Sequence, residues 1–244
     1  MKKSIAVLMC FIMLFTSAGA SQISCGYLGI TEYTNMDNVP GRHYVVNLNY
    51  ELVYAFDIVS AFIDKDSSAT KSRFGSRANS NTAQTLFAWS GHGYTGPDGG
   101  PVLYDGVYKK TDCKFKHLYV VMHTCNWLTN GGSTENQRAI YNTFNGCRLQ
   151  MGFGSQMYLD SREAVAFVDR LKTQTVGSAY VNAARIYQVQ KVNGDSIVKV
   201  AGYKDARMDY LNSGKSAAPA YSSSSASSFV EHFNVTIPAT GEVV

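Results

Sequence analysis

Three short runs of this chain are apolar at consecutive positions rather than at alternate ones. A strand of this kind must be covered on both of its faces, which is typical of strands inside a parallel sheet. Segments with helical patterns follow these runs, at 135–145, 160–172 and 175–190. Strands that alternate with helices predict an α/β protein, a three-layer α/β/α sandwich with a mainly parallel central sheet. The three runs are TLFAWS (85–90), HLYVVMHTCNW (117–127) and CRLQMGFGS (147–155).

Weaker patterns extend this prediction toward both ends of the chain. Residues 25–33 suit a first strand, residues 71–84 read as a polar connection, and Asp105-Gly106 predicts the turn of a small hairpin. The apolar spacing between residues 48 and 63 predicts one amphipathic helix that ends near Asp64. His43, His117 and His232 are expected at ordinary polar positions. The apolar stripe of that helix consists of Leu48, Leu52, Phe56, Val59 and Ile63.

The first twenty residues have the pattern of a secretory signal peptide. Lys2 and Lys3 precede an apolar run from Ile5 to Phe15, and the small residues at 18–20 follow it. The apolar run is shorter than the roughly 20 residues that a membrane-spanning helix needs. We therefore expect cleavage before Ser21, a secreted, extracellular product and no stable membrane insertion afterwards.

The mature chain is expected to hold one main domain. At 244 residues with 45% hydrophobic residues, the chain can bury one sizeable core. We assign residues 21–211 to the α/β domain and the Ser-rich residues 212–228 to a linker-like segment. Residues 229–244 are expected to form an edge strand or a tail.

The charge of the mature chain argues against nucleic acid as a partner. Loss of Lys2 and Lys3 leaves 20 basic against 18 acidic residues, so the net charge falls from +4 to +2. No basic run or basic patch interleaved with aromatic residues occurs in the sequence.

Two reactive side chains follow two of the buried strands. His92 lies between glycines after the first of these runs, and Cys125 lies at the end of the second. The carboxyl ends of parallel strands line the binding crevice of such a sheet. If the two strands are neighbours, the imidazole and the thiol face the same crevice.

These residue types in this arrangement predict a cysteine nucleophile and its general acid/base. A nearby imidazole can accept the proton of the Cys125 thiol and later protonate a leaving amine. The backbone amides of Gly93 and Cys125 are candidates for binding the developing oxyanion. No side-chain carboxylate can be assigned as a third member, so the sequence predicts a dyad, without a metal or another cofactor.

The order of these elements resembles the caspase-like cysteine peptidases of clan CD, which include caspases, legumains, gingipains and clostripain. The resemblance rests on FAWSGHG and LYVVMHTCNW, where His92 matches the catalytic histidine, Gly93 the glycine after it, and Cys125 the nucleophile. Thr124 departs from the pattern, since many members have a small or an acidic residue before the cysteine. The resemblance implies a caspase-like fold, a peptide or protein substrate and, with the signal peptide, a secreted prokaryotic branch of that group.

Two other readings of the same residues stay open. Export allows disulfides among Cys25, Cys113, Cys125 and Cys147, which would make the chain a non-catalytic binding or surface protein of the same fold. Alternatively, His123 and Cys125 lie two residues apart, and with His92 they would supply three ligands of a zinc site.

Overall fold

The computed structural model describes residues 23–94, 99–129, 134–191 and 194–240. Within these residues, seven strands form one sheet, whose order is β2-β1-β3-β6-β7-β8-β9. The five strands from β2 to β7 in this order are parallel, whereas β8 and β9 join antiparallel. The predicted mainly parallel sheet is therefore confirmed. The strands are β1 (Ser24–Gly29), β2 (Val59–Lys65), β3 (Leu86–Ser90), β6 (Tyr119–His123), β7 (Leu149–Phe153), β8 (Ser196–Tyr203) and β9 (Phe229–Ile237).

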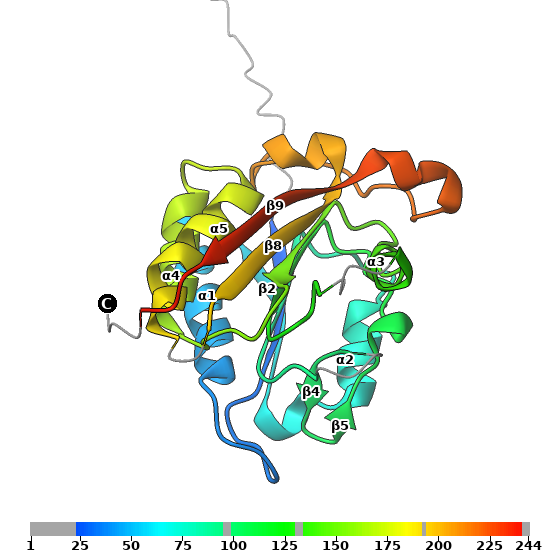
Figure 1. The fold of residues 1–244 in the computed structure, drawn as a ribbon. Helices are drawn as coiled ribbons and strands as arrows, with labels where there is room; N and C mark the ends of the chain where they lie inside the picture. Colours follow the sequence, from blue (N-terminus) through cyan, green and yellow to red (C-terminus); the bar gives the residue numbers. More distant parts are fainter. Residues whose placement is uncertain (1–22, 95–98, 130–133, 192–193, 241–244) are drawn as a thin grey trace, which may run out of the picture.

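Helices cover both faces of the sheet, which makes a three-layer α/β/α arrangement. Figure 1 shows α1, α4 and α5 on one side of the strands and α2 and α3 on the other. α1 packs on α4, and α4 packs on α5. The helices are α1 (Gly41–Phe56), α2 (Lys71–Ala78), α3 (Thr134–Tyr141), α4 (Arg162–Leu171) and α5 (Val176–Tyr187).

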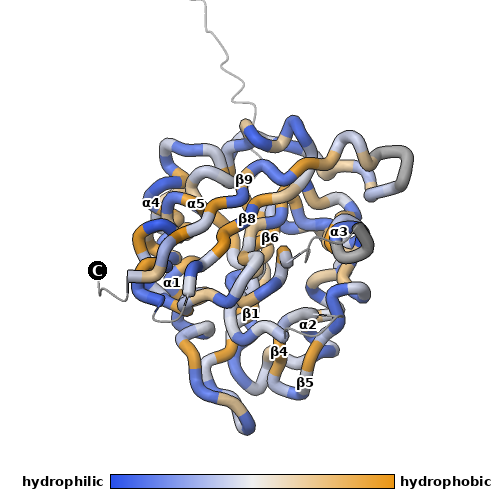
Figure 2. The backbone as a smooth tube through the Cα atoms, viewed as in Figure 1, coloured by the Kyte–Doolittle hydropathy of each residue, from blue (hydrophilic) through white to orange (hydrophobic). Residues whose placement is uncertain are grey.

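The core lies along the middle strands of the sheet. Every residue of β3, β6 and β7 is buried, as the continuous apolar runs predicted. Figure 2 shows hydrophobic stretches along the central strands and hydrophilic stretches on the surrounding helices and loops. Burial of both sheet faces explains why these strands do not alternate between apolar and polar residues.

The predicted helix at 48–63 is wrong in its second half. α1 ends at Phe56, and Asp57 follows it with a left-handed φ of 50°. Residues 59–65 form β2, which pairs in parallel with β1 at the edge of the sheet. Val59 is 43% exposed, so its place in the apolar stripe was a coincidence of spacing. The β-branched residues in this segment favour a strand.

The polar connection at 71–84 contains a helix that its composition concealed. The Thr70 hydroxyl accepts a hydrogen bond from the Arg73 amide and caps α2. Only Phe74 and Ala78 of this helix are buried, so the apolar stripe is too sparse to detect. His117, expected at an ordinary polar position, is also completely buried.

The remaining elements lie close to their expected places. The hairpin is formed by β4 (Val102–Leu103) and β5 (Gly106–Val107), and it turns one residue earlier than predicted, at 104–105. β9 lies at the edge of the sheet beside β8. The predicted signal peptide, residues 1–20, lies outside the described residues. No helix among the described residues is both long and apolar enough to cross a membrane. Short 3-10 helices span Asp66–Ser68, Lys110–Asp112, Gln188–Gln190, Lys204–Met208 and Ser223–Ser228.

Candidate active site

The sheet changes direction at β1, and the predicted site residues lie beside that point. From β1 the chain crosses to β2 on one side and then returns to β3 on the other. Open α/β sheets bind ligands at such a switch point, outside the carboxyl ends of the strands. His92 lies two residues after β3, and the loop of residues 30–40 that follows β1 lies next to it.

The loop after β1 holds His92 in place. The His92 imidazole donates a hydrogen bond from Nε2 to the main-chain oxygen of Asp37, at 2.8 Å. Tyr33 accepts a hydrogen bond from the His92 amide at 2.9 Å and packs edge-on against the imidazole, with ring centroids 4.9 Å apart. The Tyr33 hydroxyl in turn donates to the main-chain oxygen of Val102. These contacts keep the proton on Nε2 and leave Nδ1 as the basic nitrogen of the neutral ring.

Cys125 lies at the equivalent place after β6, which is the neighbour of β3. The two strands pair in parallel, with Ser90 opposite His123, so residues 92 and 125 both follow this last pair. Asn126 then adopts a left-handed φ of 58°, which an asparagine tolerates better than most residues. The chain therefore turns sharply directly after the cysteine.

The thiol of Cys125 is free, partly buried and in contact with the loop after β7. Its sulfur accepts a hydrogen bond from the Met157 amide at 3.4 Å. Burial raises the pKa of the thiol, while the Met157 amide and the ammonium of Lys191 act in the opposite direction. Lys191 is fixed near the site by hydrogen bonds from its Nζ to the main-chain oxygens of Gln156 and Asp195, at 2.9 and 3.0 Å.

Gly93 brings the two strand ends into direct contact. A Cβ at this position would lie 2.2 Å from the main-chain oxygen of Cys125 and 3.0 Å from its nitrogen. The backbones can approach this closely only because residue 93 has no side chain. Thr124, the residue before Cys125, packs against Gly93 as well. It is completely buried, and a Cβ on Gly93 would lie 2.7 Å from its Oγ1.

The structure thus places His92, Gly93 and Cys125 at two adjoining strand ends. The imidazole contacts the loop after β1, the thiol contacts the loop after β7, and no hydrogen bond joins the two side chains among the described contacts. Among the described residues, the Gly93 amide donates no hydrogen bond to another residue, whereas the Cys125 amide lies within hydrogen-bonding reach of its own sulfur. Sequence reasoning missed Asp37 and Met157, because both act through main-chain atoms that any residue type supplies.

His123 does not join His92 and Cys125 in a metal site. Its Nδ1 lies 2.9 Å from the Ser90 hydroxyl, and its Nε2 lies 3.5 Å from a carboxylate oxygen of Glu163. Its ring stacks on Tyr44 of α1, inside the core. Among the described residues, no group of three or more His, Cys, Asp or Glu side chains is arranged to hold a metal ion. The hypothesis of a zinc site with three ligands is therefore wrong. Strand β6 ends at His123, before Cys125, and the side chains of His123 and Cys125 point in different directions.

The disulfides considered for a binding protein are also not present. All four cysteines among the described residues are free thiols, and Cys25, Cys113 and Cys147 are buried. The Cys147 and Cys113 thiols lie close to the main-chain oxygens of Leu149 and Lys109. The sheet thus separates the cysteines into different parts of the core.

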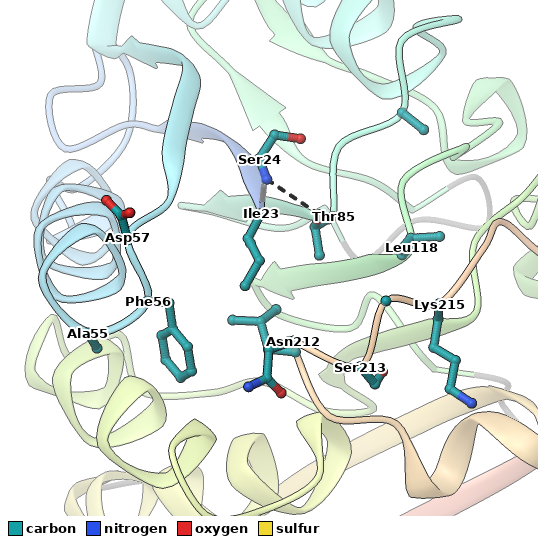
Figure 3. A pocket seen from close by; sticks show the side chains of 13 residues that line it. Ile23, Ser24, Ala55, Phe56, Asp57, Thr85, Leu118, Asn212, Ser213 and Lys215 are labelled. Carbon is teal, nitrogen blue, oxygen red and sulfur yellow. Dashed lines mark hydrogen bonds between the residues drawn. The ribbon is translucent and has the colours of Figure 1, made fainter. Parts of the chain in front are cut away.

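A pocket of about 930 Å³ lies at the opposite end of the strands. Figure 3 shows it between the end of α1, the start of β1 and the loop that carries Lys215. Phe56 and Asp57 line it from α1, and Ile23 and Leu118 line it from the starts of strands. It is therefore separate from the crevice of His92 and Cys125, which lies at the carboxyl ends.

The comparison with known proteins places the chain in a family. The family model described as "Domain of unknown function (DUF6345)" matches residues 29–232. The chain belongs to the DUF6345 family. The DUF6345 match begins at the last residue of β1, contains both His92 and Cys125, and ends within β9.

Beyond the DUF6345 family, a distant likeness to a solved structure was found. The crystal structure of the Arg specific cysteine proteinase gingipain R matches with a TM-score of 0.47 and 11% sequence identity. The match covers 81% of this chain but only 46% of that chain, so the DUF6345 chain spans less than half of the proteinase. No curated protein matches the chain in sequence.

Proposed function

We propose that this DUF6345 protein is a cysteine endopeptidase in which Cys125 is the nucleophile and His92 the general acid/base. The observation that carries the proposal is the contact of Gly93 with the Cys125 backbone. It joins the strand ends that carry a held histidine and a free thiol, next to the switch point of the sheet. A peptide or protein is the substrate class that suits this chemistry.

The proton chemistry follows from the surroundings of the two side chains. Because burial raises the pKa of Cys125, its thiol is protonated at neutral pH and a base must take the proton. With Nε2–H bound to the Asp37 carbonyl, Nδ1 of His92 is the atom that takes it. The thiolate then attacks the peptide carbonyl, and the imidazolium returns the proton to the leaving amine.

The tetrahedral intermediate carries a negative charge on the former carbonyl oxygen. The amides of Gly93 and Cys125 lie at the adjoining strand ends. The first donates to no other described residue, and the second lies beside the Cys125 sulfur. They supply the oxyanion donors of the proposed mechanism. Water then hydrolyses the thioester with His92 as the base.

Secretion is a second part of the proposal. It rests on the amino-terminal pattern of Lys2 and Lys3, the apolar run and the small residues before Ser21. An extracellular peptidase without stable membrane insertion fits this pattern.

One observation favours a non-catalytic binding protein with the same fold instead. The raised pKa of Cys125 and the missing hydrogen bond to His92 describe a resting thiol rather than a preformed ion pair. This alternative needs no disulfide, since all four cysteines are free. It predicts that removal of His92 leaves the thiol's reactivity unchanged.

The test is limited alkylation of the native protein near neutral pH, with the modified cysteine mapped by mass spectrometry. We expect labelling of Cys125 alone, because Cys25, Cys113 and Cys147 are completely buried whereas Cys125 is partly exposed. His92→Ala is expected to slow the labelling by about 100-fold, the lower range of a general base's contribution. His43→Ala, which removes an exposed histidine on α1, is the matched control.

A peptide library then tests hydrolysis itself, with Cys125→Ala as the inactive reference. Cleavage that depends on both Cys125 and His92 would support the peptidase. Equal labelling in the wild type and in His92→Ala, without cleavage of any peptide, would reject it.

A further inference from the structure

Below the proposed site lies a buried chain of polar side chains that the mechanism does not use. Ser90 and His123 are the last residues of β3 and β6, and their side chains meet at 2.9 Å. His123 Nε2 lies 3.5 Å from Glu163 of α4. This is the order of a serine hydrolase triad, yet all three side chains are completely buried. No substrate can reach the Ser90 hydroxyl, so the group is not a second active centre.

The series of buried polar side chains continues from Glu163 to Gln188. Every donor and acceptor of the Gln188 side-chain amide forms a hydrogen bond. Its Nε2 donates to Glu163 at 2.8 Å and to the main-chain oxygen of Tyr158 at 2.8 Å. Its Oε1 accepts from the Tyr158 amide at 2.9 Å and from the Ser196 hydroxyl at 3.0 Å. Two donors and two acceptors fill the hydrogen-bonding capacity of a glutamine amide, so its orientation is determined.

Tyr158 connects this series of polar side chains to Cys125, the proposed nucleophile. It directly follows Met157, whose amide donates the hydrogen bond to the Cys125 sulfur. Gln188 holds both main-chain groups of Tyr158 and thereby restrains the residue next to the Met157 amide. At the other end, Ser90 and His123 each lie two residues before His92 and Cys125. The polar chain therefore reaches the site from the loop after β7 and from both strands.

Such a chain is a poor way to stabilise a core. Burial of a carboxylate is unfavourable, and well-packed apolar residues often replace buried charged groups without loss of stability. Here His123 Nε2, Glu163 Oε1 and the hydroxyls of Tyr44 and Tyr180 have no hydrogen-bond partner among the described residues. The 3.5 Å contact of His123 with Glu163 is therefore not a hydrogen bond. These buried polar side chains add little stability, yet Gln188 contacts the backbone next to the Met157 amide that binds Cys125. We therefore infer that their role is to position the site.

We propose that Gln188 is a positioning residue for the Cys125 sulfur, held in its orientation by Glu163, Ser196 and the Tyr158 backbone. The inference rests on the proposed function in one respect, that the positioned thiol is the nucleophile. Gln188 acts through the Tyr158 and Met157 backbone and does not touch the reacting atoms.

The test follows the rate of Cys125 alkylation over a pH series in Gln188→Ala. Loss of the fixed Met157 donor removes a hydrogen bond to the thiolate. We expect the inflection of the pH profile to rise by about one unit, which is about tenfold slower alkylation at neutral pH. The plateau rate at high pH, where the thiol is fully ionised, is expected to stay unchanged or to rise.

Gln84→Ala is the matched control, because Gln84 is also a buried glutamine but lies before β3, at the far end of the sheet. It should leave the inflection in place. Ser196→Ala removes the hydroxyl that donates one hydrogen bond to Gln188 Oε1. This variant replaces Gln188→Ala in the test if Gln188→Ala does not fold. It should raise the inflection in the same direction by a smaller amount.

An unchanged or lowered inflection in the folded variants would overturn the positioning role. This outcome is distinct from failure of the proposed function, because alkylation requires no substrate. A wild type that cleaves no peptide while its inflection still rises in Gln188→Ala would reject the peptidase and keep the positioning role.

Discussion

A buried histidine in this protein makes its stability depend on pH in a predictable way. His117 is completely buried and stacks on Phe87, with ring centroids 4.9 Å apart. Its Nδ1 accepts a hydrogen bond from the Gln84 amide at 3.0 Å, and its Nε2 donates to the main-chain oxygen of Arg77 at 2.9 Å. A proton on Nδ1 would place two donors against each other. The ring is therefore neutral in the folded protein.

Burial lowers the pKa of His117 from 6.5 to about 4. Between these two values the unfolded chain binds more protons than the folded chain, so the free energy of unfolding falls as the pH falls. One pH unit corresponds to about 1.4 kcal/mol. The contribution of His117 to stability is complete above pH 6.5, and about 2 kcal/mol is lost by pH 5 and about 3 kcal/mol by pH 4.

The assay compares urea unfolding of the wild type and of His117→Asn at a series of pH values. An asparagine Oδ1 can still accept from the Gln84 amide but does not titrate. The variant is expected to be less stable at pH 7, because the stacking on Phe87 is lost. Its stability should depend less on pH than that of the wild type, by about 2 kcal/mol between pH 7 and pH 5. Parallel curves for the two proteins would refute the reasoning.

Two further substitutions test how the fold supports the site and the core. Gly93→Ala is expected to lower the free energy of unfolding by about 1–3 kcal/mol, because its Cβ would meet the Cys125 carbonyl. The same variant should alkylate at Cys125 more slowly, and equal stability with equal reactivity would contradict the close approach. Asp209→Ala leaves the largely buried Arg148 without its main partner and is expected to cost about 3–5 kcal/mol in urea unfolding. Asp205→Ala removes the exposed partner of the same arginine and should cost less than about 1 kcal/mol, so similar losses in both variants would disprove this assignment.

The strands that carry the site could be predicted because each contains its own signal. The run LFAW (86–89) is apolar at every position, and this pattern has few explanations other than a strand buried on both faces. The glycines around His92 marked a close approach of backbone in the same local way. Elements whose sequence pattern was mixed were harder to predict. Val59 and Ile63 of β2 continued a helical spacing by chance, and α2 has only two buried residues.

The supports of the candidate site could not be predicted from their residue types. Asp37 and Met157 contribute a main-chain oxygen and a main-chain amide, groups that every residue except proline carries. Gln188 and Glu163 are ordinary polar residues in the sequence, and only the packing of α4 and of residues 188–190 against the sheet buries them. His117 was expected at an ordinary polar position for the same reason, because burial depends on what packs above a residue.

The sequence by itself determined the class of fold and the placement of His92 and Cys125 at the carboxyl ends of two buried strands. These properties follow from local periodicity and from the rule that parallel strands end at the same edge of a sheet. Only the tertiary structure decided that the His92 and Cys125 strands are neighbours and that the four described cysteines are free. It also decided that His123 points into the core and that Cys125 is held by the loop after β7. Each of these depends on distances between residues more than 30 positions apart in the chain, which no local pattern encodes.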